Sequence, residues 1–279
     1  MWHFFCIITK NILMKIRVVT FLLFMVSVLC KINAQTGVSV SPPRLYFESD
    51  LGRSNTQQIT ITNVSVKNSL DLAVSLGDWE YDGKGENMMY PANTLPTSCA
   101  NWISVKKEDS YFTLAPGERK DIDVTITVPN TSSDKLAAHT AVLYVSQMNP
   151  VDDVDSKGAN IKVSIRSGIK LFHKLSSANI KKIEIQNLVY DKSKNRLSLF
   201  FENQGNVWID GKVYTDLVNT ETGKKTSLDN VIFYTMPGNK REMDIVLPSL
   251  EKGKYTASVM IDYGDANNLE VGELNFNYE

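Results

Sequence analysis

Beyond its first 34 residues, almost every periodic segment of this 279-residue chain alternates apolar and polar residues with a period of two. Such alternation is typical of β-strands with one buried face, because successive side chains of a strand point to opposite sides. Short sequences rich in Gly, Pro, Asn and Asp separate these segments, and no helical period interrupts them. The sequence therefore predicts an all-β protein.

The strands fall into two sets, of about seven strands each, on either side of residue 175. The short strands and turns of the first set are typical of a β-sandwich, and the second set, in about 100 residues, has the size of an immunoglobulin-like β-sandwich. The hydrophobic fraction of 43% is sufficient for two such cores. We therefore expect two tandem immunoglobulin-like domains, over residues 35–175 and 176–279.

The most informative strand pattern covers Asn160–Phe172, which reads N-I-K-V-S-I-R-S-G-I-K-L-F. Its apolar face consists of Ile161, Val163, Ile165 and Ile169, and its polar face of Lys162, Ser164, Arg166 and Lys170. The rhythm breaks at Ser167-Gly168, where a residue without Cβ permits a bulge. Two interpretations stay open: an ordinary core strand, or an edge strand that lends its apolar side chains to a partner.

The N-terminal segment has the features of a secretory signal that begins at Met14. Lys15 and Arg17 precede an apolar run, Val18–Leu29, and the small residue Ala34 favours cleavage after it. The run is shorter than the roughly 20 residues of a membrane span, so the mature chain is expected to carry no span. Residues 1–13 then form an upstream extension of the signal.

The positions of the three cysteines bear on how this N-terminal segment is processed. A lipid anchor on Cys30 is the second interpretation, since Leu29 stands where a lipidation signal has a small residue. Cleavage after Ala34 removes two of the three cysteines and leaves Cys99, so a disulfide within the mature chain is excluded. We expect Cys99 to be a buried small apolar residue.

The charges and motifs argue against several functions. The 30 basic and 31 acidic residues nearly balance, which gives no argument for nucleic-acid binding. His139 and His173 lie far apart in sequence and are expected at the surface or at strand ends. The acidic residues Asp152, Asp153 and Asp155 are expected in a solvated loop, because they lack the spacing of a calcium loop. No catalytic motif is present, so we expect neither an enzyme nor a bound cofactor or metal.

Two cations stand out. Arg44 follows the pair Pro42-Pro43 in the first strand, and Lys170 lies near the end of the Asn160–Phe172 pattern. If both strands lie at the domain junction, the two cations meet in the cleft between the domains. Two cations held together repel each other unless an anion joins them, and a peptide's terminal carboxylate suits such a site.

Three short motifs, in this order along the chain, resemble the periplasmic pilus-assembly chaperones of the chaperone–usher pathway (the PapD-like family). The first is Val38-Ser39 followed by Arg44 and Phe47. The second is the turn Leu114-Ala115-Pro116-Gly117-Glu118. The third is Ile169-Lys170-Leu171-Phe172-His173, at the end of the first strand set. The resemblance covers residues 37–175.

This resemblance implies a site and a mechanism. Arg44 and Lys170 would bind the terminal carboxylate of a client subunit. Ile161, Val163 and Ile165 would fill the groove of a pilin-like or other surface subunit that lacks its last strand, which is donor-strand complementation. An outer-membrane usher would be a further partner, and the location would be the periplasm.

The chain also departs from that family. Residues 82–101 form a longer connection than the family shows, and the second domain carries no family motif. The alternative function is a structural or adhesive tandem-sandwich protein of the cell envelope, in which the two cations have no partner role.

Overall fold

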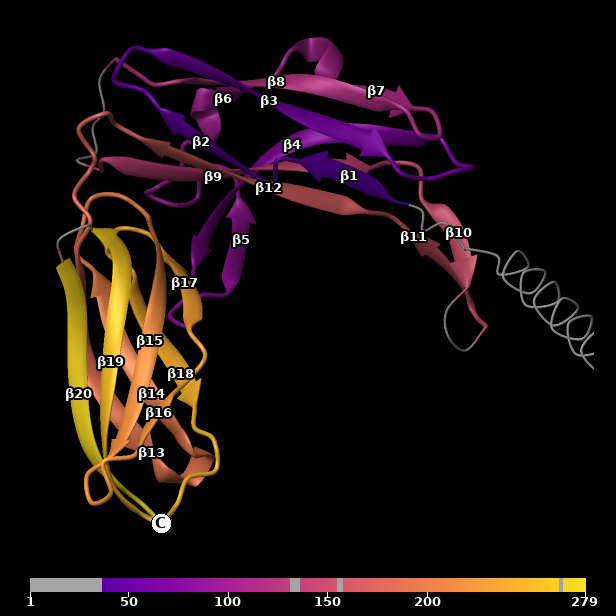
Figure 1. Cartoon of the computed structure of the whole chain (residues 1–279). Coiled ribbons are helices and arrows are strands. Elements are labelled where there is room, and N and C mark those ends of the chain that lie inside the picture. Colours follow the sequence, from indigo (N-terminus) through magenta and orange to yellow (C-terminus); the bar gives the residue numbers. More distant parts are fainter. Residues whose placement is uncertain (1–36, 131–135, 155–157, 266–267) are drawn as a thin grey trace, which may run out of the picture.

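The computed structural model describes residues 37–130, 136–154, 158–265 and 268–279, and it confirms the predicted all-β fold. Two sandwiches lie at an angle to each other, so that the molecule is L-shaped (Figure 1). The predicted signal, with its cleavage after Ala34, lies outside the described residues. None of the helices in the described ranges is long and apolar enough to span a membrane.

The first sandwich packs a sheet of order β1-β3-β8-β6 against a sheet of order β2-β12-β9-β4-β5, with β7 also pairing with β4. Its strands are β1 (Val38–Ser41), β2 (Arg44–Glu48), β3 (Ser54–Asn63), β4 (Leu70–Tyr81), β5 (Asn87–Pro91), β6 (Ile103–Ser104), β7 (Tyr111–Leu114), β8 (Arg119–Thr127), β9 (Ala138–Gln147), β10 (Val151–Val154), β11 (Asn160–Val163) and β12 (Arg166–Lys174). Two short 3₁₀ turns, η1 (Ala100–Trp102) and η2 (Lys107–Asp109), lie between strands.

The alternating apolar residues of these strands form one core. Ile59 and Ile122 from one sheet and Leu72 and Leu143 from the other are fully buried in it. Cys99 is buried as well, in agreement with its expected role. The first strand pattern changes sheets at a cis Ser41–Pro42 bond, which divides it into β1 and β2. Each half is an edge strand, as prolines require.

The second sandwich packs a sheet of order β13-β14-β18 against one of order β16-β15-β19-β20, with β17 pairing with β15. Its strands are β13 (Ile183–Asp191), β14 (Arg196–Asn203), β15 (Ile209–Asn219), β16 (Lys225–Ser227), β17 (Val231–Thr235), β18 (Lys240–Val246), β19 (Gly253–Asp265) and β20 (Asn268–Tyr278), and η3 (Lys192–Lys194) is a 3₁₀ turn. A separate core lies between its sheets, around Leu199, Phe201 and Val259.

The longer connection over residues 82–101 forms a strand in its first part. β5 pairs with β4 in a long hairpin, and Pro91 is tolerated because it ends an edge strand. The rest stays a loop, whose conformation depends on the buried carboxylate of Asp78. This carboxylate accepts hydrogen bonds from the backbone N–H groups of Thr94 and Leu95.

The solvated loop expected around Asp152 and Asp153 is a strand instead, because β10 pairs with β11 in a second hairpin. Asp152 lies opposite Lys162 in its register, so opposite charges face each other across the strands. Asp152 is exposed there, and Asp155 lies outside the described residues. Figure 1 shows this hairpin at the end of the first sandwich that points away from the second.

The expectation for the two histidines is right about strand ends and wrong about the surface. His139 is the second residue of β9 and His173 the next-to-last of β12, and both are buried. β9 and β12 make His139 and His173 register partners, with 1% and 0% exposure. Their Nδ1 atoms lie 3.4 Å apart, and Nε2 of His173 lies 2.9 Å from the carbonyl oxygen of Ser49. Nε2 of His173 must therefore carry the proton. Burial, followed by the charge of His139, lowers the pKa of His173.

We predict that the free energy of unfolding falls as the pH drops below about 6.5, the ordinary pKa of histidine. The unfolded chain binds protons there more readily than the folded one, because the pKa of His173 is lower in the folded state. The slope is at most about 1.4 kcal/mol per pH unit for each histidine. Urea unfolding between pH 7.5 and 5.5 measures it, and His173→Gln should flatten the curve. Equal slopes in both proteins would contradict the assignment.

Candidate functional site

The parallel pairing of β2 with β12 brings the two predicted cations together. In its register Arg44 lies opposite Lys170, although the two are far apart in the sequence. Adjacent residues of a sheet in register project from the same face, so both side chains enter the space between the two domains. The local reason is the Pro42-Pro43 kink, which moves the chain from the first sheet to the edge of the second just before Arg44.

The ammonium group of Lys170 lies against the β4–β5 hairpin. Its Nζ donates to the hydroxyl of Tyr81 at 3.3 Å and to Oδ1 of Asn87. It also lies 4.1 Å from the ring centroid of Trp79 and 4.4 Å from that of Tyr81. Burial, and then the charge of Arg44, lower the pKa of Lys170 to about 8, against the opposing effect of Asp210.

The guanidinium of Arg44 contacts residues of the second domain. Its carbon Cζ lies 4.4 Å from the ring centroid of Tyr234 in β17. Nη1 lies 3.9 Å from Oδ2 of Asp210 in β15, and it donates to the hydroxyl of Tyr46 at 3.4 Å. Both domains therefore contribute side chains to the cleft around Arg44.

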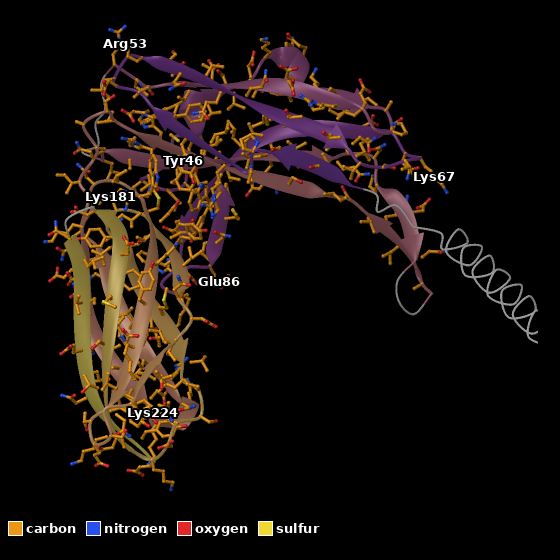
Figure 2. All side chains as sticks on the ribbon, viewed as in Figure 1. Tyr46, Arg53, Lys67, Glu86, Lys181 and Lys224 are labelled. Carbon is orange, nitrogen blue, oxygen red and sulfur yellow. The ribbon has the colours of Figure 1, made fainter. Side chains whose placement is uncertain are left out.

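An aromatic cluster next to these residues joins the two domains. Phe172 packs on Tyr46, on Trp79 and on Trp208 of the second domain, with ring centroids 4.9, 5.0 and 5.4 Å apart. Trp208 also lies 5.6 Å from Tyr46, which Figure 2 labels at the junction. Such pairs add to the free energy of apolar burial, so the cluster limits motion of one domain against the other.

The charges of the cleft suit an anion. Asp210 is about half exposed, and its pKa is raised by burial, which the charges of Arg44 and Lys181 oppose. It offsets one positive charge, while Arg44 and Lys170 supply two. A carboxylate entering the cleft would balance the second and accept charge-assisted hydrogen bonds from both groups.

A strand edge leads away from this cleft. β12 pairs with β9 along its whole length but with β2 only from Lys170 to Lys174. Within the described residues, Arg166–Ile169 have no ladder partner on the side opposite β9, and β11 has none on the side opposite β10. The edge is thus an unpaired row of backbone donors and acceptors that begins beside the two cations.

The expected single strand over Asn160–Phe172 is interrupted, and the interruption lies at Ser164-Ile165 instead of Ser167-Gly168. β9 ends at Gln147, whose carbonyl oxygen accepts from the hydroxyl of Ser164. The backbone N–H of Gln147 donates to the carbonyl oxygen of Ile165 at 2.8 Å. Before this interruption the chain forms β11, which pairs with β10 in the protruding hairpin, and after it the chain joins the main sheet as β12.

The apolar residues predicted to contact a client are accessible. Ile161 is 39% and Val163 37% exposed, and Ile165 is half-buried. Ile169 and Leu171, with the same parity, are buried in the core of the first domain. The apolar face of the pattern is therefore buried in the protein's own core at its C-terminal end and exposed to solvent at its N-terminal end.

Several residues of the cleft were not predicted from the sequence. Asn87, Tyr234 and Asp210 have no local pattern that marks them. Asn87 reaches Lys170 through the pairing of β4 with β5, whereas Tyr234 and Asp210 reach Arg44 through the docking of the two domains. The turn Asp82-Gly83-Lys84-Gly85 was a visible signal for the hairpin that carries Asn87. Within the described residues, no group of three or more His, Cys, Asp or Glu side chains gathers as metal ligands.

Comparisons with known proteins give structural matches only. No protein-family model matches the sequence, and no curated protein matches it. The fold is similar to that of the chaperone CsuC in a complex with a tip adhesion subunit from the archaic chaperone–usher Csu pili of Acinetobacter baumannii. The identity is 12%, 85% of this chain and 97% of that chain are covered, and the TM-score is 0.47.

Two further structures give similar values. The Escherichia coli chaperone DraB has 16% identity, covers 88% of this chain and 96% of its own, and has a TM-score of 0.44. The SafB chaperone, in a complex with the Salmonella enterica SafA pilin, has 14% identity, coverage of 86% and 97%, and a TM-score of 0.43. All three structures contain a chaperone, in two cases bound to a tip adhesion subunit or a pilin, and at these identities and TM-scores the likeness concerns the fold alone.

We predict that Lys170 makes the protein more stable at alkaline pH than at neutral pH. Its pKa of about 8 lies below the ordinary value for lysine, so between pH 8 and about 10 the unfolded chain holds a proton that the folded chain has lost. The free energy of unfolding should rise with pH in that window relative to Lys170→Met. Denaturant titrations of both proteins at pH 7.5, 8.5 and 9.5 test this. A constant difference between them would contradict it.

Proposed function

We propose that this protein is a periplasmic chaperone that binds pilus or other surface subunits by donor-strand complementation. The observation that carries the proposal is the combination of two adjacent cations, Arg44 and Lys170, with an unpaired strand edge that begins beside them. The resemblance of three sequence motifs to the PapD-like family supports it. An outer-membrane usher as a further partner follows from that resemblance.

The geometry suits a subunit strand that ends in a carboxylate. With its terminal carboxylate between Arg44 and Lys170, a client strand would run along β12 and β11 as far as Ile161. At about 3.3 Å per residue, this edge is roughly 30 Å long. Backbone groups of the edge would supply ladder hydrogen bonds whatever the client's sequence.

The carboxylate site would fix the register of that ladder. A shift of one residue turns every side chain of a strand to the opposite face, so a register anchor decides which side chains meet. With the anchor in place, Ile161, Val163 and Ile165 enter the groove that the client's missing strand leaves open. Full burial of such a side chain contributes about 1.5–3 kcal/mol, and these contribute less because they are already partly buried.

Neutralising either cation should abolish subunit accumulation without unfolding the chaperone. The variants are Lys170→Gln and Arg44→Gln, co-expressed with a candidate surface subunit from the same genome, and the measurement is the amount of subunit recovered in complex. Matched controls are Lys106→Gln and Arg119→Gln, which remove exposed cations from the loop after β6 and from the start of β8. If both cleft variants keep normal subunit levels, the chaperone proposal is wrong and the structural or adhesive alternative gains weight.

A charge introduced on the exposed apolar face should also weaken subunit binding, because the client groove would have to bury it. Val163→Asp places a carboxylate where the client groove would bury it, so complex formation should fall at least tenfold, since a buried unpaired charge costs several kcal/mol. Thermal unfolding of the free protein should change little, because Val163 is 37% exposed. Val246→Asp is the control, at a valine that is 75% exposed in the second domain. Equal affinity in both variants would argue against client contact at Val163.

A further inference from the structure

The turn of the β4–β5 hairpin lies on the second domain. The backbone N–H of Glu242 in β18 donates to the carbonyl oxygen of Gly83 at 2.7 Å, and the carboxylate of Glu242 lies 2.6 Å from Nζ of Lys84. Figure 2 labels Glu86, in this turn, next to the second domain. The longer connection noted in the sequence is therefore a contact between the domains.

Arg241 is the buried residue of this contact. It is 6% exposed, and its guanidinium donates from Nη2 to the carbonyl oxygen of Lys84 at 3.1 Å and from Nη1 to the carbonyl oxygen of Tyr234. A buried charge is costly unless hydrogen bonds compensate it, and burial lowers the pKa of Arg241. Removing either carbonyl partner should therefore be unfavourable.

Gly85 leaves room for that guanidinium. Its φ is +89°, a conformation that favours glycine, and a Cβ there would lie 1.9 Å from Nη2 of Arg241. Any larger residue would displace the side chain of Arg241. The glycine of the first domain and the arginine of the second are thus complementary in shape.

The two carbonyl groups that Arg241 joins belong to the two halves of the carboxylate site. Lys84 lies in the hairpin that carries Tyr81 and Asn87, the hydrogen-bond acceptors of Lys170. Within the described residues, the ring contacts of the Lys170 ammonium also come from this hairpin. Tyr234 is the residue whose ring lies against Arg44. One guanidinium therefore connects the surroundings of both cations.

We propose that Arg241 is a positioning residue for the carboxylate site. It latches the β4–β5 hairpin to the second domain and so holds Tyr81 and Asn87 around the ammonium of Lys170, in register with Arg44. A two-stranded hairpin extension is marginally stable without packing, so the latch decides whether this half of the site is ordered. That the site binds a client's terminal carboxylate rests on the function proposed above, whereas the latch itself is a property of the free protein.

The test compares Arg241→Met and Gly85→Ala in the full mature chain without a client. The pKa of Lys170 is followed by NMR, with Lys170→Gln used to assign the signal, and hydrogen exchange is measured at the amides of Asn87–Tyr90. In both variants Lys170 should regain water, so its pKa should rise from about 8 towards the ordinary value for lysine. Hydrogen exchange in β5 should accelerate about tenfold or more.

Two further variants separate the latch from a general loss of structure. Arg241→Lys keeps the charge but not the two-armed donor, so it should restore the wild-type values only in part. Lys84→Ala removes the exposed ion pair with Glu242 and leaves Arg241 in place, so both readouts should stay near wild type. In the double variant of Gly85 and Arg241 the effects should not add, because both break one contact.

The latch is refuted if the pKa of Lys170 and the exchange of β5 keep their wild-type values in both Arg241→Met and Gly85→Ala. It is also refuted if Arg241→Met binds a subunit as tightly as wild type while Lys170→Gln does not, a result that would leave the proposed function intact. The opposite pattern, altered free-protein readouts with subunit binding that never depends on Lys170, would support the latch and overturn the proposed function.

Discussion

The parallel pairing of β2 with β12 is the interaction on which the candidate site depends. It holds two like charges in neighbouring positions, where the charge of Arg44 disfavours the charged state of Lys170. The cost is offset by ring faces, hydroxyl groups and one carboxylate from the second domain. Such an arrangement reduces stability at neutral pH, which is typical of a site that is kept for binding.

The second domain takes part in the site although its sequence carries no recognisable motif. Asp210 and Tyr234 contact Arg44 directly, and Arg241 reaches the hairpin that surrounds Lys170. The aromatic cluster around Phe172 joins the domains below the two cations. The first domain thus supplies the cations and the strand edge, and the second supplies much of their environment.

The strand edge and the cleft differ in how many contacts the protein itself makes to them. Polar contacts and packed rings order the cleft, whereas the β10–β11 hairpin extends away from both cores and exposes Ile161 and Val163. An unpaired apolar edge favours association with another strand. In the proposed function the anchor selects the register and the edge provides the contact area, so neither is sufficient alone.

The sequence by itself determined the all-β fold, the two strand sets and the residues with apolar and polar faces, because alternation with period two is a local property of the chain. It also singled out Arg44 and Lys170. It did not predict β5 or β10, whose short sequences do not alternate with period two and which form through pairing with β4 and β11. The interruption at Ser164-Ile165, the buried histidine pair and the role of Arg241 were decided only by the tertiary structure. Each depends on contacts between segments distant in sequence, and no local pattern encodes these.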